Sequence, residues 1–167
     1  MRQNRNVVGI MIMVFFLSVF SAQGRASDRV ILSVSGAITK GGEVHRVDFT
    51  LAELKALPQY VFKTKNPWVS EPHKYRGPRL SAILKKVGAG SDRLTLIALN
   101  DYQIDLNFKK IQKYHPILAW SDNGKIMSVR DRGPLWLMLP VFRYPELKDN
   151  QYNSYMVWQL RRIIVHH

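Results

Sequence analysis

The sequence predicts a single α+β domain with mixed β-sheets and short helices. Segments rich in β-branched and aliphatic residues outnumber the segments with helical spacing, and each helical segment is only about two turns long. The length of 167 residues suits one domain, and 46% hydrophobic with 22% charged residues is typical of a packed core rather than of a disordered chain. No internal repeat or low-complexity segment divides the chain.

Residues 1–26 have the order of a secretory signal peptide. Arg2 and Arg5 precede an uncharged run of 14 residues at 7–20, and small residues follow it. The run is shorter than the roughly 20 residues of a membrane-spanning helix, which favours cleavage over anchoring. We expect cleavage before Ser27, with Arg25 as the alternative start, and a location in the bacterial periplasm.

The mature domain expected from this cleavage, residues 27–167, is basic and contains no cysteine. It has 22 basic and 12 acidic residues, because the leader removes three arginines and no acid, and its net charge is +10. This positive charge has two interpretations. It belongs to a solvated surface without a partner, or it attracts an anionic small molecule, an acidic protein or an anionic membrane surface. No nucleic-acid-binding signature accompanies it, so no nucleic acid partner is expected. The absence of cysteine excludes disulfides, thiolate metal ligands and a cysteine nucleophile.

The first elements of the mature domain are predicted to be a hairpin and a capped helix. Residues 30–38 are rich in β-branched and aliphatic residues, and after a Thr-Lys-Gly-Gly turn residues 44–49 alternate in polarity. Thr50 and Glu53 have the spacing of a capping box, and the leucines that follow recur at helical spacing up to Pro58.

The next part of the chain predicts a strand, a long loop and a second helix. Residues 60–65 are typical of a strand, whereas residues 65–78 contain three prolines and little periodicity, which predicts an irregular loop. Loops of this length are often functional. Residues 80–87 place apolar side chains on one helical face before Gly88.

The second half of the chain is predicted to be rich in strands. Asn100-Asp101 tolerates the left-handed conformation of a tight turn, and Asn123-Gly124 is a strong hairpin signal. The expected elements are, in order, strands at 93–99 and 102–107, a short helix at 109–113, strands at 117–121 and 125–129, and strands at 135–141 and 159–165.

Several short motifs follow one another in a fixed order along the chain. They are Phe-Thr-Leu-Ala-Glu-Leu-Lys-Ala-Leu-Pro at 49–58, the loop with Trp68, Tyr-Arg-Gly-Pro-Arg-Leu at 75–80, Leu-Asn-Asp-Tyr at 99–102, Asp-Asn-Gly-Lys at 122–125, Ser-Val-Arg-Asp-Arg-Gly-Pro-Leu-Trp at 128–136, Pro140, and Trp-Gln-Leu at 158–160. This order resembles the molybdopterin-binding domain of the sulfite-oxidase superfamily over nearly all of residues 28–165, and the resemblance implies a sulfite-oxidase-type fold.

The missing cysteine separates this chain from the enzymes of that superfamily. They hold molybdenum through a cysteine thiolate near the end of the strand before the Trp68 loop, a region that here reads Phe-Lys-Thr-Lys at 62–65. A hydroxyl such as that of Thr64 is a poor replacement for a soft thiolate. Among cysteine-free relatives, the sequence is similar to the periplasmic pterin-binding proteins of the PruR type, which respond to reduced pterins and control a membrane-bound cyclic-di-GMP enzyme.

This resemblance implies a non-catalytic protein that relays pterin availability. The effector would be a reduced pterin of the tetrahydro-monapterin or neopterin type, without molybdenum, and the partner would be the periplasmic domain of an inner-membrane diguanylate cyclase or phosphodiesterase. Two alternatives remain open: a molybdopterin-dependent oxidoreductase with non-cysteine metal ligation, and an interaction module with an occluded pocket. No hydrolase, kinase or dinucleotide-binding motif is present in the sequence.

A pterin is a flat bicycle with a hydrogen-bonding edge, so its pocket needs an aromatic face and polar groups at that edge. Trp68 and Tyr75 lie in the expected loop and Tyr102 follows the Asn100-Asp101 turn; core packing is the alternative role of each ring. The Asp101 carboxylate is suited to accept paired hydrogen bonds, with turn formation as its alternative role. Trp136 and Trp158 lie in regular segments and are interpreted as core residues.

Charged candidates come from a bend and from the proline-rich loop. The resemblance implies that Arg130 and Asp131 belong to a bend at the cofactor's edge, whereas Arg132 is a weaker candidate because three successive side chains cannot all face the same way. His73 is suited to donate to a ligand carbonyl, and simple exposure is its alternative. No catalytic or metal site is expected, and the predicted ligand-binding residues are Trp68, Tyr75, His73, Asn100, Asp101, Tyr102, Arg130 and Asp131.

Overall fold

The computed structural model of the protein describes residues 29–42 and 45–167. The predicted signal peptide at residues 1–26 lies outside these ranges. Within them, no helix is both long enough and apolar enough to cross a membrane.

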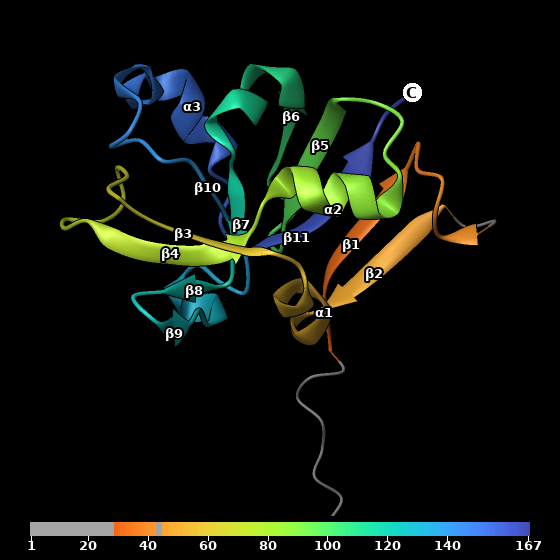
Figure 1. Ribbon diagram of the computed structural model, residues 1–167, viewed down its shortest axis with the longest axis horizontal. Helices are drawn as coiled ribbons and strands as arrows, with labels where there is room; N and C mark the ends of the chain where they lie inside the picture. The colour runs from red at the N-terminus through yellow and green to blue at the C-terminus, as the bar shows by residue number, and fades with distance from the viewer. Residues whose placement is uncertain (1–28, 43–44) are drawn as a thin grey trace, which may run out of the picture.

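The largest sheet has five strands and is mixed, as the sequence predicts. β1 and the C-terminal β11 run parallel, and every other neighbouring pair in this sheet is antiparallel. Figure 1 shows the two ends of the described chain meeting in this sheet. The strand order is β2 (Arg46–Thr50), β1 (Val30–Gly36), β11 (Leu160–Val165), β5 (Arg93–Ala98) and β6 (Gln103–Asn107).

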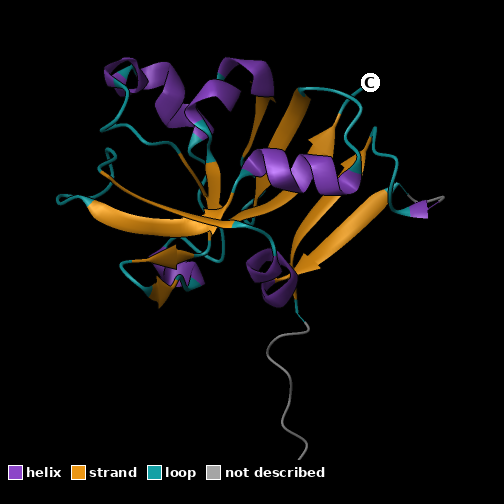
Figure 2. Ribbon diagram, in the orientation of Figure 1, coloured by secondary structure: helices purple, strands orange, loops and turns teal. Residues whose placement is uncertain are grey.

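Two smaller sheets form the other part of the domain. Figure 2 shows the β3–β4 hairpin as a long curved pair beside the five-stranded sheet. The four-stranded sheet has the order β3 (Gln59–Thr64), β4 (His73–Pro78), β8 (Ser121–Asp122) and β9 (Lys125–Ile126), and the two-stranded sheet pairs β7 (Ile117–Ala119) with β10 (Trp136–Met138).

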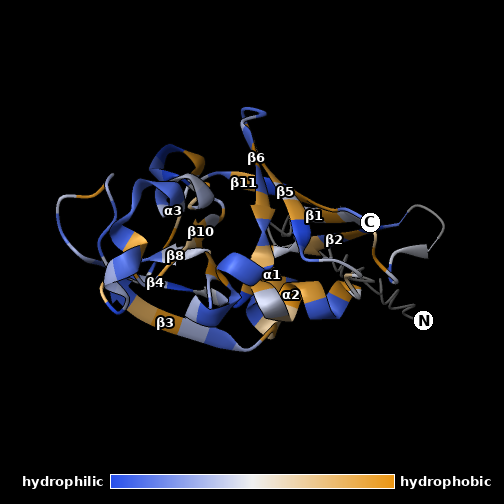
Figure 3. Cartoon of the chain, turned by 90° about the horizontal axis from the view of Figure 1, so that it is seen from above, coloured by the Kyte–Doolittle hydropathy of each residue, from blue (hydrophilic) through white to orange (hydrophobic). Residues whose placement is uncertain are grey.

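The helices are short and connect the sheets. α2 lies over one face of the five-stranded sheet (Figures 1 and 3) and buries its apolar stripe of Leu80, Ile83, Leu84 and Val87. Gly88 ends α2 in the left-handed conformation, with φ of 66°. The α-helices are α1 (Leu51–Ala56), α2 (Leu80–Val87) and α3 (Asn150–Tyr155), and the 3₁₀-helices are η3 (Phe108–Lys110), η4 (Gln112–Tyr114), η5 (Val129–Asp131) and η6 (Pro145–Lys148).

The prediction of an irregular loop over residues 65–78 is wrong in its second half. Residues 73–78 form β4, which pairs with β3 along six residues. The prolines favoured a loop, although the burial alternates as in a strand: Lys74 and Arg76 are exposed, and Tyr75 and Gly77 are buried. Gly77 allows a close approach that no larger residue permits, since a Cβ there would lie 1.9 Å from the backbone oxygen of Leu118.

The other differences are local. The strand expected at 117–121 is divided into β7 and β8, and Asn123-Gly124 forms the turn between β8 and β9 with φ of 46° and 83°. The helix expected at 109–113 is a pair of 3₁₀-helices, η3 and η4. α3 was not predicted, because its Asn-Gln-Tyr-Asn-Ser-Tyr sequence has low helix propensity and no apolar stripe.

The capping box at the start of α1 predicts a measurable contribution to stability. Thr50 Oγ1 accepts a hydrogen bond from Glu53 N at 3.3 Å, and Glu53 Oε2 accepts one from Thr50 N at 2.7 Å. We expect Thr50→Ala to lower the free energy of unfolding by about 1 kcal/mol, measured by urea denaturation, and Thr50→Ser to retain most of it. The same loss in both variants would contradict a role for the hydroxyl.

The stabilising effect of the capping box should also depend on pH. The backbone hydrogen bond from Thr50, followed by the one from its hydroxyl, lowers the pKa of Glu53 below its ordinary value of 4.5. A carboxyl whose pKa is lower in the folded state stabilises the protein above its unfolded pKa, and this contribution is lost as the pH falls through the folded pKa. Because Thr50→Ala keeps the backbone donor and loses only the hydroxyl, the difference between wild type and Thr50→Ala should shrink only in part between neutral pH and about pH 3.

Candidate functional site

A cavity of about 260 Å³ lies where the Trp68 loop, the β5–β6 turn and the segment after α3 meet. We call it the tryptophan cavity. It is slightly smaller than the range of about 300–1,000 Å³ typical of small-molecule sites, so it suits a small flat ring system better than an extended cofactor. Its lining residues are Trp68, Ala98, Asn100, Tyr102, Asn153, Ser154, Met156, Val157 and Trp158.

Two tryptophans from distant parts of the chain form the aromatic wall. Trp68 and Trp158 meet edge to face, with ring centroids 5.0 Å apart and planes at 80°. Both pack on Trp136, at 6.0 and 6.4 Å. Trp136 is 1% exposed, and its Nε1 donates to the carbonyl of Met156 at 2.9 Å. The aromatic wall is therefore anchored in the hydrophobic core.

Asn66 and Arg132 hold the Trp68 loop in place by hydrogen bonds. The buried Asn66 accepts from Trp68 N through Oδ1 at 3.0 Å and donates to the Tyr75 hydroxyl through Nδ2 at 3.2 Å. Arg132 Nη2 donates to the Trp68 carbonyl at 3.0 Å, and its guanidinium lies 5.4 Å from the centre of the Trp136 ring. Arg132, a weak candidate from the sequence, thus positions Trp68.

Two asparagines supply polar groups of opposite kind to the cavity. Asn100 Oδ1 accepts a hydrogen bond from Tyr102 N at 3.2 Å, so its NH2 group is the part that a ligand can use as a donor. Asn153 Nδ2 donates to Asn150 Oδ1 at 3.3 Å, so its side-chain oxygen is the part that a ligand can use as an acceptor. The cavity therefore combines aromatic surface with one amide donor and one amide acceptor.

The structure brings three of the predicted site residues together in this cavity: Trp68, Asn100 and Tyr102. Asp101 lies between two of them but is not among the lining residues. It has φ of 61°, as its interpretation as a turn residue requires, and its carboxylate is 3.5 Å from Arg162 Nη2. The Asp101 side chain is 76% exposed.

Tyr75 and His73 lie on β4, outside the cavity lining. Tyr75 is fully buried and packs edge to face on Trp136 at 5.6 Å. Burial, assisted by the nearby charge of Asp122, raises the pKa of Tyr75 to about 12, so its hydroxyl stays protonated at physiological pH. His73 Nδ1 lies 2.8 Å from Asp122 Oδ2, which ties β4 to β8. Tyr75 thus supports the Trp68 loop through its hydrogen bond from Asn66, whereas His73 joins two strands of the four-stranded sheet.

Arg130 and Asp131 form part of η5 and are exposed. Asp131 Oδ2 accepts a hydrogen bond from Ser128 Oγ at 2.6 Å, inside the same bend. Gln159 connects this bend to the start of β11, since its Nε2 donates to the carbonyl of Val129 at 2.8 Å. Neither Arg130 nor Asp131 lines the tryptophan cavity.

The far wall of the cavity was missed from the sequence. It consists of Asn153 and Ser154 of α3 and of Met156, Val157 and Trp158. Trp158 was interpreted as a core residue, and it both packs on Trp136 and lines the cavity. The signal that could have found this wall is the presence of Asn153 five residues before Trp158.

The residues at the expected metal position do not fit molybdenum. The sulfite-oxidase-type fold implies a thiolate ligand near the end of β3, and this chain holds no cysteine. Thr64, the last residue of β3, is fully buried, and its hydroxyl is directed to the Lys65 carbonyl at 3.4 Å. A neutral hydroxyl lacks the softness of a thiolate, so the donor set of this chain does not match the metal.

No family model matches the chain, and no curated protein matches it in sequence. Among solved structures, the chain is similar to the crystal structure of the sulfane dehydrogenase SoxCD from Paracoccus pantotrophus, with a TM-score of 0.62 and 16% sequence identity. The match covers 84% of this chain and 38% of that chain, so this protein spans well under half of its neighbour's length. At this identity the likeness shows the fold alone. It confirms a single α+β domain with a fold of the sulfite-oxidase type.

Proposed function

We propose that this protein is a non-catalytic, periplasmic pterin-binding protein of the PruR type. In this proposal it relays the availability of a reduced pterin to a membrane-bound cyclic-di-GMP enzyme. The observation that carries the proposal is the tryptophan cavity, which combines aromatic walls with paired amide groups in a sulfite-oxidase-type fold without a metal-ligating cysteine.

The cavity matches the chemistry of a pterin in two respects. Its tryptophans and Tyr102 offer ring surface to a flat bicycle, and stacking of a heterocyclic base on an aromatic side chain contributes about 1–3 kcal/mol. The amino-pyrimidinone edge of a pterin carries an amino donor and a carbonyl acceptor. These groups complement the oxygen of Asn153 and the NH2 group of Asn100.

A route from ligand to partner is suggested by the limited burial of α3. This six-residue helix has no buried residue, although Asn153 and Ser154 line the cavity. A ligand that contacts these residues would favour the ordered position of α3 over alternatives, because a ligand shifts a population by its differential affinity. A partner that recognises the ordered surface would then respond to pterin.

The test uses the full chain, secreted with its leader and recovered from the periplasm. We expect tetrahydroneopterin, added without oxygen, to quench tryptophan fluorescence saturably and to raise the melting temperature. At a free ligand concentration 100 times Kd, the expected stabilisation is about 2.7 kcal/mol. Elemental analysis of the same sample should find no stoichiometric molybdenum.

Two results would contradict the proposal. Stoichiometric molybdenum with a pyranopterin would identify an oxidoreductase with atypical ligation. If neither tetrahydroneopterin nor tetrahydro-monapterin changed the melting temperature, the remaining interpretation would be an interaction module with an occluded pocket.

A further inference from the structure

A groove of about 380 Å³ follows the free edge of β3. In the described part of the chain, β3 pairs with β4 on one side and with no strand on the other. Residues 60–63 all line the groove, and successive side chains of a strand point to opposite faces of a sheet. A groove lined by four consecutive strand residues therefore runs along the edge of the strand. We call it the edge groove.

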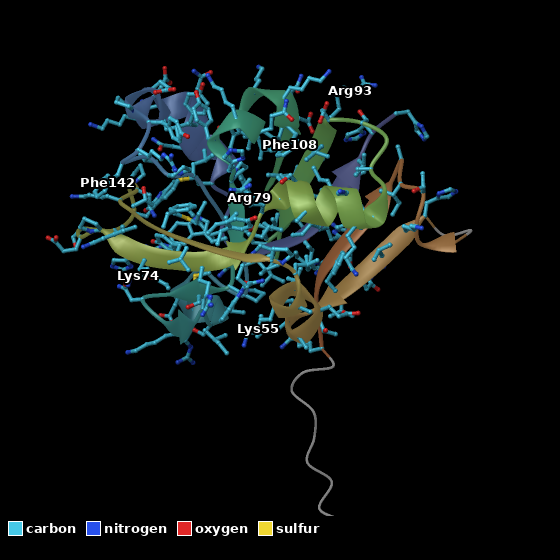
Figure 4. All side chains as sticks on the ribbon, viewed as in Figure 1. Lys55, Lys74, Arg79, Arg93, Phe108 and Phe142 are labelled. Atoms are coloured by element: carbon cyan, nitrogen blue, oxygen red, sulfur yellow. The ribbon has the colours of Figure 1, made fainter. Side chains whose placement is uncertain are left out.

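The rest of the edge groove is lined by residues from other parts of the chain. The largest group is Pro140 with residues 142–144, and Tyr114, His115, Ile117 and Arg79 also line the groove. Figure 4 labels two of these lining residues, Phe142 and Arg79. The space thus lies between an unpaired strand edge and these other residues, where an added strand would be held on both sides.

The edge groove exposes apolar surface. Tyr60 is 36% exposed, Val61 50% and Phe142 53%, and these are three of the seven large hydrophobic residues exposed in the described part of the chain. Clustered apolar exposure beside an unpaired edge is a feature that proteins normally cover or guard. It indicates a surface that another polypeptide covers.

The charge of the edge groove selects the kind of polypeptide. Its lining includes Lys63, Arg79 and Arg143 and no aspartate or glutamate. The Arg79 guanidinium lies 3.9 Å from the centre of the Tyr60 ring, which holds this cation at the groove. A second copy of the chain would bring like charges together at this edge, whereas an acidic segment would meet complementary ones.

We infer that the edge groove binds an extended acidic segment of a partner protein, which adds to β3 as a further strand. Main-chain hydrogen bonds to the β3 edge supply affinity, and acidic side chains facing Lys63 and Arg143 supply specificity. The identification of the partner as the periplasmic domain of the signalling enzyme rests on the proposed function. Strand addition itself requires no pterin.

The test uses a fluorescein-labelled peptide of about eight residues that alternates glutamate with valine or threonine, matched to the length of a strand. We expect the full chain to bind this peptide and to bind a lysine-for-glutamate version far more weakly. Lys63→Glu combined with Arg143→Glu should weaken binding about tenfold or more, because two attractions become repulsions. Bound peptide should also slow hydrogen exchange at β3 amides.

A matched control separates the groove from net charge. Lys40→Glu combined with Lys125→Glu makes the same change of charge at exposed positions that do not line the edge groove. Binding by this control should stay within about twofold of the wild type at moderate salt. Equal weakening in both double variants, or β3 amides that exchange as fast with peptide as without it, would overturn the inference. Sedimentation could instead show that the chain self-associates and that the dimer excludes the peptide. That result would assign the β3 edge to a second copy of the chain and would also overturn the inference.

The proposals for the edge groove and for the pterin site can be tested independently. Lys63 and Arg143 are outside the lining of the tryptophan cavity, so their double reversal should leave tetrahydroneopterin binding unchanged. A wild-type chain that binds pterin but not the acidic peptide would overturn the edge groove alone. A chain that binds the peptide but no pterin would overturn the proposed function alone.

Discussion

Replacing Trp68 by alanine is expected to weaken pterin binding by about 5- to 150-fold, which corresponds to the 1–3 kcal/mol of one aromatic stacking interaction. Trp68 lies in the loop after β3, and its contacts with Trp136 and Trp158 orient its ring at the cavity. Removing the indole deletes stacking surface and widens the cavity. Trp68→Phe keeps an aromatic face and should recover most of the affinity.

The measurement is anaerobic calorimetric titration with tetrahydroneopterin, with circular dichroism to show that each variant is folded. Trp120→Ala is the matched control. Trp120 is also half-buried and is held by a hydrogen bond from its Nε1 to Gln59 Oε1 at 2.8 Å, but it does not line the cavity. If folded Trp68→Ala bound tetrahydroneopterin with an unchanged Kd, the assignment of the pterin site to the tryptophan cavity would be contradicted.

The parts of the fold that could be predicted from the sequence depend on local chemistry. The capping box of Thr50 and Glu53, the Asn123-Gly124 turn and the Gly88 helix end each require particular residues within a few positions of one another. β4 was missed because its partners decide its structure. Its proline-flanked sequence becomes a strand through pairing with β3 and with β8, which lies far along the chain.

In the candidate site too, the residues that lie in local turns could be predicted and the contacts between distant segments could not. Trp68, Asn100 and Tyr102 lie in or beside turns that the sequence marks clearly, and all three line the cavity. The wall from Asn153 to Trp158 was missed because spacing along the chain does not indicate which distant segments meet. Arg132 was underestimated for a related reason, since its role is a hydrogen bond to the carbonyl of Trp68, which lies far away in the sequence.

The largest loss of stability is expected from Trp136→Ala. Trp136 is 1% exposed and contacts Trp68, Trp158 and Tyr75, with ring centroids between 5.6 and 6.4 Å apart. Its removal would leave a large cavity at the point where the cavity wall joins the core, and it would leave the carbonyl of Met156 without the Nε1 donor. Substitutions of this kind cost about 3–5 kcal/mol, a large part of the 5–15 kcal/mol by which domains are usually stable.

Urea denaturation of wild type, Trp136→Ala and Trp136→Phe would measure this contribution. Phenylalanine keeps much of the packing and loses the hydrogen bond, so its loss should be clearly smaller than that of alanine. Because Trp136 supports both Trp68 and Trp158, folded Trp136→Ala at low temperature should also bind tetrahydroneopterin more weakly than Trp136→Phe. A free energy of unfolding for Trp136→Ala within about 1 kcal/mol of the wild type would show that the aromatic wall is not anchored through this residue.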